Sequence, residues 1–510
     1  MTVSQIAMLI AMALYLLSMV GIGVKLSKKN ETVNDFYLGG RKLGPFVTAM
    51  SAEASDMSSW LLMGLPGVAY LSGVASAGYT ALGLALGTYV NWLLIAKRLR
   101  RYTAVNKSIT LPQFFSRRYG DKKHLLALVA AIEIVIFFIP YTASGFAACG
   151  KLFNSLFGID YHVAMIVSAI VIILYTTLGG FLAASTTDLI QSVIMSIALI
   201  IILVFGINVA GGLDNVIHNA KSLPGYLDLS GAYDPVAKKA TSISGLYIFS
   251  NIAWGLGYFG MPHILIRFMA IEDDNKIALS RRVASIWAFI SMAISIGIGV
   301  IGLAMSNFNK IDTLQGSASE TIIVKISDLL SKQGILFAII AGIVLSGILA
   351  STMSTSDSQL LAASSAISND IYVGFFKAKV SDKKLMILSR ITLLIIAVVG
   401  MVLAWDPNSS VFAIVSFAWA GFGATFGPIV LLALFWRRSN MQGALAGLIT
   451  GGVMVFLWKF GISSLGGIFA IYELLPAFIL ALVINIIVSL LTSAPNTEVL
   501  ADFDKVKNMQ

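Results

Sequence analysis

Long apolar runs separated by short polar segments recur along the whole chain. Each run is roughly 18 to 25 residues long, which is enough to cross a hydrocarbon core of about 30 Å as an α-helix. The pattern therefore predicts about thirteen membrane-spanning helices, whose ends a sequence fixes only to within several residues. These helices are expected at residues 3–26, 45–70, 74–97, 125–150, 161–182, 187–211, 243–268, 283–306, 335–365, 386–405, 409–435, 441–461 and 469–493.

Composition excludes a soluble protein. Of the 510 residues, 57% are hydrophobic and 12% are charged, and the mean hydropathy is +0.87. The first run, residues 3–26, lacks the basic start and small-residue cleavage site of a signal peptide, so we expect it to remain as a helix. The longest loops, near residues 212–242 and 306–334, are too short for a large soluble domain. We predict an all-α polytopic membrane protein with a single transmembrane domain over residues 1–510.

Basic residues gather in alternate loops, and this sets the expected orientation. With the N-terminus outside, the loops assigned to the cytoplasm hold about 27 Lys and Arg, against about 8 in the outer loops. The richest segment, Lys97 to Lys123, directly follows a span, so we expect it to fix topology near anionic lipid rather than to bind nucleic acid. The formal net charge of +10 has the same explanation. The tail at residues 494–510 is then cytoplasmic, and the protein is expected in the cell membrane.

Asp56 stands out because it lies in an apolar run, in the stretch "ASDMSSW". A carboxylate at the centre of a span costs roughly 2.5 to 3.5 kcal/mol on insertion scales unless something compensates. One explanation is a structural hydrogen bond inside the bundle. The other is a functional break, because serines flank Asp56 and "GLPG" (Gly64 to Gly67) follows within two turns. Glycine and proline allow the chain to leave helical geometry, and the carbonyls freed there can bind a cation.

A second interrupted span contains "WGLGYFGMP", Trp254 to Pro262. Packing glycines in a kinked helix are one explanation for this segment. However, the two interrupted spans are the second and the seventh, and an odd offset of five inverts the second half in the membrane. Paired interruptions of this kind indicate a secondary transporter made of two inverted repeats, with its site at the breaks. The repeats are expected at residues 45–211 and 243–435.

The ninth expected span carries a stripe of hydroxyl side chains. Its members are spaced i, i+3, i+4 and i+7, so they share one helical face. They are Ser351, Ser354, Thr355 and Ser358. Such stripes often only join membrane helices, but beside free carbonyls they also supply the hard, neutral oxygens that replace the water around a small alkali cation. Asp357 lies beside the stripe. The pattern does not decide whether Asp357 belongs to the ion path or is a structural partner.

Four ordered segments resemble the sodium/solute symporter family, and the chain is similar to its sodium/proline symporters along nearly its whole length. The resemblance implies the leucine-transporter fold, with ten core helices in two inverted halves. One helix, residues 3–26, is added before the core and two helices, residues 441–493, follow it. The matching segments are Gly39 to Gly67, Tyr175 to Gln191, Trp254 to Leu265 and Ala433 to Gly452.

The same resemblance implies a sodium site between the second and ninth helices. The implied ligands are the carbonyls of Ala54, Met57 and Ser351 and the hydroxyls of Ser354 and Thr355. Sodium, the co-transported ion, is the partner that these oxygens suit.

Further residues match positions that support sodium binding in the family. They are Asp56, Ser58 and Asp188. We expect Asp56 to add negative field and to hold the unwound segment rather than necessarily to touch the ion. Arg41 matches a functionally sensitive arginine at the cytoplasmic end of the second helix.

For the substrate, the resemblance implies L-proline and singles out Tyr141, Trp254, Tyr258 and Pro262. Aromatic walls suit both the proline ring and its secondary ammonium group, and a helix N-terminus at the break can meet its carboxylate. Pro140 and the residues around Asp357 differ from the sequence pattern typical of sodium/proline symporters. A betaine-like osmolyte or pantothenate therefore stays open as the substrate, as does coupling to protons.

The sequence thus predicts a symporter that couples inward sodium flow to proline uptake by alternating access. An ion channel more often assembles its pore by symmetry than from a broken-helix pair within one chain. A membrane enzyme needs a catalytic set such as a paired histidine and carboxylate, and a transporter-like sensor needs a signalling domain. We expect neither, because Cys149 is the only cysteine, the four histidines are scattered, and a short polar tail follows the last span.

Overall fold

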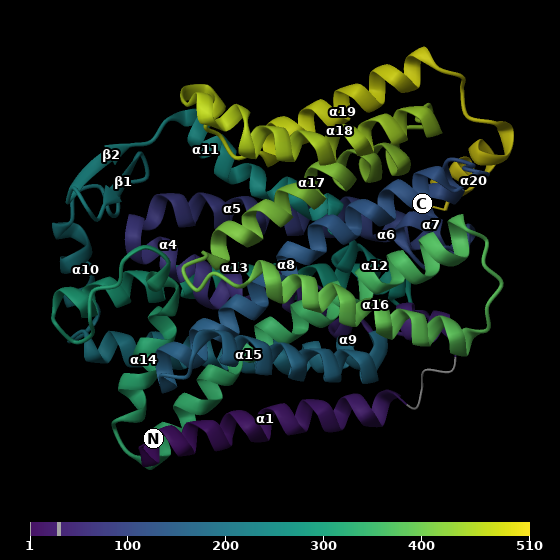
Figure 1. The fold of residues 1–510 in the computed structure, drawn as a ribbon. Coiled ribbons are helices and arrows are strands. Elements are labelled where there is room, and N and C mark those ends of the chain that lie inside the picture. The colour runs from purple at the N-terminus through teal and green to yellow at the C-terminus, as the bar shows by residue number, and fades with distance from the viewer. Residues whose placement is uncertain (1, 28–31, 510) are drawn as a thin grey trace.

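The protein is a bundle of long helices that run roughly along one axis (Figure 1). The computed structural model describes residues 2–27 and 32–509. The long helices are α1 (Val3–Ser27), α5 (Val74–Val90), α8 (Leu125–Phe157), α9 (Tyr161–Val209), α13 (Ile277–Asn307), α15 (Ile335–Ser365), α16 (Asp382–Leu403), α17 (Val411–Phe435), α18 (Met441–Phe460) and α19 (Leu474–Leu491). Helix α1 lies at one edge of the bundle, and α18 and α19 lie at the opposite edge (Figure 1).

Two spans are made of shorter pieces. The first consists of α3 (Pro45–Ser59), the π-helical turn η2 (Trp60–Gly64) and α4 (Leu65–Ser72). The second consists of α11 (Gly245–Ile252), the 3₁₀ segment η4 (Ala253–Gly260) and α12 (Pro262–Ala270). These are the second and seventh spans of the sequence pattern, so the expected pair of broken helices is confirmed.

Short elements connect or extend the long helices. Helix α5 continues through η3 (Asn91–Ala96) into α6 (Lys97–Val105), and α15 continues into η7 (Ala366–Phe375). The others are α2 (Val33–Leu38), η1 (Gly39–Arg41), α7 (Leu111–Arg118), α10 (Leu213–Ser222), β1 (Gly231–Asp234), β2 (Lys239–Ser242), η5 (Asp274–Lys276), η6 (Gly316–Thr321), α14 (Ile322–Ser331), η8 (Ile462–Leu465), η9 (Gly467–Phe469) and α20 (Thr497–Lys507). The two strands pair antiparallel, with Gly231 opposite Ser242 and Asp234 opposite Lys239.

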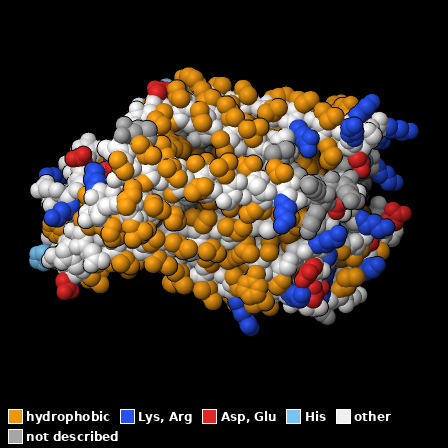
Figure 2. Space-filling view, turned by 90° about the horizontal axis from the view of Figure 1, so that it is seen from below, with side chains coloured by type: hydrophobic (Ala, Val, Ile, Leu, Met, Phe, Trp, Pro, Cys, Tyr) orange, Lys and Arg blue, Asp and Glu red, His pale blue; other side chains and the backbone are white. Residues whose placement is uncertain are grey.

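Ten helices in the described part of the chain are long and apolar enough to cross a membrane. The two broken spans are not among these ten helices, and Tyr161–Thr177 is a shorter apolar helix. The all-α membrane architecture is confirmed, while the number of spans stays a prediction. Hydrophobic side chains cover the middle of the molecule, and Lys and Arg gather mostly at the end that holds α7 and α20 (Figures 1 and 2).

Helix α9 contains two of the expected spans without the loop predicted between them. The chain bends at Gly180, whose φ of 66° and ψ of −175° leave helical geometry. Glycine adopts this conformation readily because it has no Cβ. The turn therefore lies at Gly180, just before the expected gap at residues 183–186.

Short polar side chains fix where several helices begin. Ser244 Oγ accepts the N–H of Tyr247 at 3.1 Å at the start of α11. Ser410 Oγ accepts the N–H of Ala413 at 3.1 Å at the start of α17. Such N-caps satisfy donors that the first helical turn leaves free, so the helices around the broken spans start at defined residues.

The expected cytoplasmic tail, residues 494–510, contains a docked helix. Helix α20 buries Phe503 beneath the guanidinium groups of Arg98 and Arg118, which lie 5.3 Å and 4.9 Å from its ring centroid. Arg437 also pairs with Asp504 at 2.9 Å. The tail is therefore packed against α6 and α7 over these residues.

Candidate transport site

The backbone of α3 leaves helical geometry at Ser58. Its φ is 41° and its ψ is −170°, a conformation that non-glycine residues seldom adopt and that costs on the order of 1–3 kcal/mol. Ser58 Oγ accepts the backbone N–H of Trp60 at 3.1 Å, which supports the break. Backbone strain of this kind gathers at functional sites.

The second break is held by α17. Met261 joins η4 to α12 with a φ of −75° and a ψ of 106°. The indole N–H of Trp419 donates to the carbonyl of Trp254 at 2.8 Å. Gly257 lies directly against this indole, because a Cβ at position 257 would overlap the ring. A side chain on α17 thus fixes the non-helical segment in place.

Asp56 connects the two breaks. The Tyr258 hydroxyl of η4 donates to Asp56 Oδ2 at 2.5 Å. The Tyr141 hydroxyl of α8 donates to the Asp56 carbonyl at 3.1 Å. Two tyrosines from different helices therefore fix both the side chain and the backbone of Asp56.

A small cavity of about 10 Å³ lies between the breaks, which is about the room that one water molecule needs. Half of its lining residues are aromatic, and Trp60 and Trp254 have ring centroids 5.8 Å apart. Phe412 lies against the same two rings, at 6.0 Å and 5.4 Å. The cavity is lined by Asp56, Met57, Trp60, Leu84, Tyr141, Trp254, Val415 and Trp419. Because the cavity is so small, the walls must move apart to admit an organic solute.

The hydroxyl stripe of α15 meets the first break beside this cavity. Ser354 Oγ donates to the Ala54 carbonyl at 2.8 Å, and Thr355 Oγ1 reaches the same oxygen at 3.4 Å. The Ser351 carbonyl lies 3.2 Å from Ser354 Oγ. The side chains of Ser354 and Thr355 and the carbonyls of Ala54 and Ser351 thus form one cluster of hard, neutral oxygens, which suits a small alkali cation.

Asp188 lies in a neighbouring buried polar cluster. Its Oδ2 accepts the Ser51 hydroxyl at 2.7 Å and pairs with Arg267 at 3.2 Å. Arg267 also donates to Ser358 Oγ at 2.5 Å, and Ser358 Oγ donates to Asp357 Oδ1 at 3.2 Å. The cluster therefore links α3, α9, α12 and α15. The second oxygen of each carboxylate, Oδ1 of Asp188 and Oδ2 of Asp357, has no hydrogen-bond partner among the described residues.

Arg41 lies away from the cavity, where α3 is about to begin. It donates to three backbone carbonyls, those of Thr103 at 3.0 Å, Ser108 at 2.6 Å and Met269 at 2.6 Å. These carbonyls belong to the end of α6, the loop before α7 and the end of α12. Arg41 thus joins three segments at the end of the bundle where basic residues gather.

At the opposite end, Glu320 of η6 holds the start of α17. Its carboxylate pairs with Lys151 of α8 at 2.8 Å. It also accepts the Ser410 hydroxyl at 2.7 Å and the N–H groups of Val411 and Phe412 at 3.0 Å. An anion at a helix N-terminus is favourable, and here it holds Phe412 over the aromatic wall.

Two predicted residues are not brought into these groups. Met57 lines the cavity, but its carbonyl accepts the N–H of Trp60 and forms no hydrogen bond with an α15 hydroxyl in the described part of the chain. Pro262 is the first residue of α12 and is absent from the described cavity lining. The other predicted residues each lie at the breaks, in the oxygen cluster, in the Asp188 cluster or, for Arg41, at the end of the bundle.

Several residues of the site were not singled out from the sequence. Arg267 carried a usable signal, because a charge inside an apolar span is unfavourable and marks a functional position. Glu53 carried the same signal one turn before Asp56. Trp419 and Phe412 had none, because aromatic residues are common in apolar spans such as residues 409–435.

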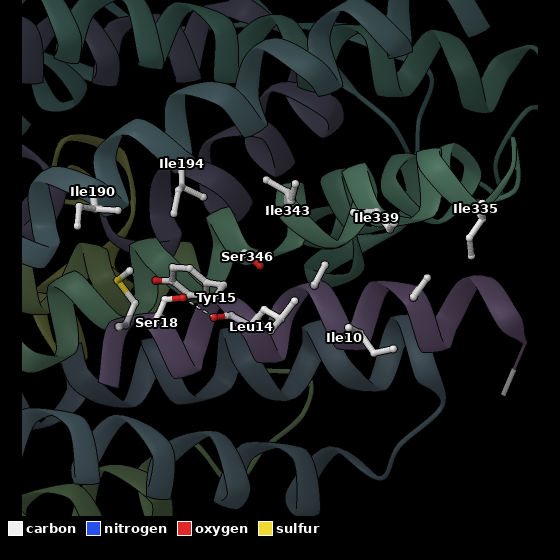
Figure 3. A pocket seen from close by; sticks show the side chains of 13 residues that line it. Ile10, Leu14, Tyr15, Ser18, Ile190, Ile194, Ile335, Ile339, Ile343 and Ser346 are labelled. Carbon is white, nitrogen blue, oxygen red and sulfur yellow. Dashed lines mark hydrogen bonds between the residues drawn. The ribbon is translucent and has the colours of Figure 1, made fainter. Parts of the chain in front are cut away.

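A larger groove of about 580 Å³ lies between α1, α9 and α15. Figure 3 shows isoleucine and leucine side chains from all three helices along it, with Tyr15 and Ser346 among them. Tyr15 accepts a hydrogen bond from Gln191 at 3.1 Å. The groove has no charged lining residue and lies among membrane-spanning helices, so its chemistry suits a hydrocarbon chain better than a charged solute.

A family model and several known transporters match this chain over most of its length. The model of the family described as "SSF: Sodium:solute symporter family" matches residues 36–451. The osmoregulated proline transporter OpuE of Bacillus subtilis is 42% identical over 494 residues, which cover 96% of each chain. The sodium/proline symporter of Haemophilus influenzae is 43% identical over 507 residues, covering 98% of this chain and 97% of that protein. The sodium/proline symporter of Escherichia coli is 41% identical over 496 residues, covering 96% and 94%.

Two solved structures share the fold. A Na⁺-coupled sialic acid symporter in a substrate-bound outward-open state aligns with a TM-score of 0.78 at 18% identity, covering 96% of this chain and 99% of that chain. Mhp1, a nucleobase-cation-symport-1 family transporter in a closed conformation with bromovinylhydantoin bound, aligns with a TM-score of 0.57 at 13% identity, covering 92% and 98%. At these identities the likeness bears on the fold alone, and it confirms the expected leucine-transporter-like architecture.

Proposed function

The chain belongs to the sodium:solute symporter family, and on this premise we propose that it takes up L-proline by coupling its entry to inward sodium flow. The relatives that are 41% to 43% identical over nearly the whole chain are proline transporters or sodium/proline symporters by name. Uptake would proceed by alternating access, with the two breaks open to one side of the membrane at a time.

The observation that carries the proposal is the meeting of Ser354 and Thr355 with the Ala54 carbonyl. Sodium binds here, between the first break and α15, and the Ser351 carbonyl is a further ligand. The Met57 carbonyl completes the set, because a carbonyl oxygen has two lone pairs and the N–H of Trp60 uses only one. An ion at this position joins α3 to α15 and so favours one arrangement of the two helices.

Four other residues support the ion or the motion. Ser58 holds the break, and Asp56 adds negative field beside it. Asp188 is proposed to stabilise the ion from its cluster with Arg267. Arg41 controls the cytoplasmic end of the first broken helix, because it joins carbonyls of three segments there.

The cavity between the breaks is the proposed proline site. Tyr141 and Trp254 line it, and the Tyr258 hydroxyl reaches it through Asp56. Aromatic faces suit the pyrrolidine ring and its ammonium group. Pro262 begins α12, so its part is to expose the N-terminus of that helix rather than to touch the solute in this closed conformation.

The protein is proposed to lie in the cell membrane with its N-terminus outside and its C-terminus in the cytoplasm. The gathering of Lys and Arg at the end that holds α7 and α20 supports this orientation. The inverted repeats are proposed at residues 45–211 and 243–435, with the helix at residues 3–26 before them and two helices at residues 441–493 after them.

The test is uptake of radiolabelled L-proline into proteoliposomes under an imposed sodium gradient, with a proton gradient of equal size in parallel. We expect accumulation only with sodium, and its loss in Tyr258→Ala. Equal uptake under the proton gradient would show that sodium is not the specific coupling ion. If betaine or pantothenate were taken up and proline were not, the proposed sodium site would stand, but the proposed substrate would be wrong.

A further inference from the structure

The side of α3 that faces α5 carries a buried glutamate, Glu53. Glu53 is 1% exposed, and Asp56, one turn later on the same helix, is 5% exposed. No ion pair in the described part of the chain includes either carboxylate. A buried carboxylate in a membrane is unfavourable without a compensating partner. One sodium ion at the Ala54 carbonyl would offset only one of these two charges, so the other still needs a partner.

The polar groups around Glu53 come from α5 and η3. Thr88 Oγ1 and Trp92 Nε1 donate to Glu53 Oε1 at 2.9 Å and 3.4 Å. Asn91 lies between these two residues in the chain, and its Nδ2 donates to the Tyr258 carbonyl at 3.0 Å. Glu53 Oε2 and Asn91 Oδ1 are both buried and have no hydrogen-bond partner among the described residues. Both atoms are acceptors, so only a donor or a cation can satisfy them.

We propose that Glu53, Thr88 and Asn91 form a second sodium site, between the first broken span and α5. A hard cation prefers oxygen ligands, and these residues offer a carboxylate, a hydroxyl and an amide oxygen. The Tyr258 carbonyl is a fourth candidate ligand, because it has two lone pairs and the Asn91 amide uses only one. The inference rests on the proposed function, which supplies sodium as the coupling ion, and it adds a second ion to that function.

The backbone of this region is irregular in two of its segments. Helix α5 ends at Val90, and η3 begins at Asn91 as a π-helical turn. Single π-helical turns within α-helices occur frequently at functional sites. The Tyr258 carbonyl belongs to the 3₁₀ segment η4 of the second break. The proposed site therefore brings together the carboxylate of α3 and irregular backbone from two other segments.

The second site lies on a different side of α3 from the first. Ala54 faces Ser354 of α15, whereas Glu53 faces Thr88 of α5. An ion at Glu53 joins α3 to α5 and, through the Tyr258 carbonyl, to η4, and the first ion joins α3 to α15. Both ions order the same broken span, so binding of either raises the affinity for the other by the same factor.

The test is the number of sodium ions bound per protein molecule. Equilibrium binding of radioactive sodium to the purified protein is measured without proline, and we expect two ions per molecule. The dependence of sodium binding on sodium concentration should be sigmoidal, because the two ions raise each other's affinity. In proteoliposomes, the initial fluxes of radioactive sodium and radiolabelled proline should then have a ratio of two to one.

Two variants address the second site. Glu53→Gln removes the charge, so it should reduce the count from two ions to one and abolish the sigmoidal dependence. Thr88→Val keeps the charge and the branched shape but removes the hydroxyl, and the affinity for one of the two ions should fall about tenfold. Glu133→Gln is the matched control, because Glu133 lies in the membrane-spanning helix α8 against Gly452 of α18 and forms no ion pair in the described part of the chain. It should still bind two ions.

The outcomes separate this inference from the proposed function. One sodium ion per wild-type molecule, with sodium-driven proline uptake, would overturn the inference alone, and this result decides even if the variants do not fold. Two ions in both the wild type and a folded Glu53→Gln protein would also overturn it, because the second ion would then lie elsewhere. Two ions in the wild type and one in Glu53→Gln, without any proline uptake, would support the inference and refute the proposed substrate.

Discussion

The hydroxyl of Ser354 lies 2.8 Å from the carbonyl oxygen of Ala54, 300 residues earlier in the chain. This contact joins α15 to the broken span, and Thr355 reaches the same oxygen. A bound sodium ion would link the two helices in the same way but more strongly. The oxygens proposed to surround the ion are therefore also oxygens that join the two helices.

Replacing Ser354 and Thr355 by alanine should weaken sodium coupling. The double variant loses two of the five proposed ligands, and we expect the sodium concentration for half-maximal uptake to rise at least about tenfold, equivalent to about 1.4 kcal/mol. The measurement is initial proline uptake against sodium concentration in proteoliposomes. Ser346→Ala on the same helix is the control, because Ser346 Oγ donates to the carbonyl of Gly342 in its own helix and to no other helix in the described part of the chain. Equal effects in both proteins would exclude a specific role for the pair.

Trp419→Phe should weaken proline binding and spare sodium. Phenylalanine keeps an aromatic ring beside the cavity but removes the N–H that holds the Trp254 carbonyl at 2.8 Å. One neutral hydrogen bond contributes about 0.5–1.5 kcal/mol, so we expect proline affinity to fall about two- to tenfold. The measurement is equilibrium binding of radiolabelled proline.

The control for this change is Trp458→Phe. The Trp458 indole also donates to a carbonyl, that of Phe469 at 3.1 Å, but at an exposed position away from both breaks. Its loss should leave proline affinity unchanged. A similar fall in both variants would indicate a general loss of stability rather than a role for Trp419 at the break.

The parts of the site that a sequence can reveal are those whose chemistry conflicts with lipid. Asp56 was predictable because a carboxylate in an apolar run needs an explanation. Ser354 and Thr355 were predictable because their spacing puts them on one helical face. Trp419 was not, because an indole in an apolar helix has no such conflict, and its role depends on Gly257 being brought beside it by the fold.

The fold also has features that the sequence predicts and features that it does not. The long apolar runs and the two interruptions were predictable because they follow from helix length and from glycine and proline. The turn at Gly180 lies slightly before the expected gap, since only the backbone shows which glycine takes a positive φ. The docking of α20 was not predictable, because it depends on Arg98 and Arg118 meeting Phe503 from distant parts of the chain.

Lys151→Met should strongly destabilise the protein. Lys151 and Glu320 form a buried ion pair at 2.8 Å, with side chains 7% and 4% exposed. Removing one partner of a buried pair leaves an uncompensated charge and costs about 3–5 kcal/mol. The measurement is thermal unfolding of the purified protein. Lys332→Met is the control, because Lys332 pairs with Asp328 at the same distance but at an exposed position, where a pair contributes about 0–1 kcal/mol. Similar melting temperatures for both variants would contradict this account.

Acidification should release α20 from the bundle. The hydrogen bond and charge of Arg437 lower the pKa of Asp504 below its usual value of 3.8, and the same contact raises the pKa of Arg437. A lowered pKa means that docking favours the charged carboxylate. The contribution of Asp504 is therefore complete at neutral pH and is lost as the pH falls below 3.8 and through the lowered pKa.

Hydrogen exchange of the α20 amides between pH 7 and pH 3, corrected for intrinsic exchange rates, measures this release. Protection should fall at the acidic end in the wild type, and Asp504→Asn should already be less protected at pH 7, with a smaller change on acidification. High salt should act in the same direction, because the Arg437–Asp504 pair is exposed and is screened within about 10 Å at 0.1 M ionic strength. Asp502→Asn, on the same helix but without an ion pair in the described part of the chain, should behave like the wild type. If the wild type and Asp504→Asn lost protection in parallel, the buried contacts of Phe503 alone would hold the helix.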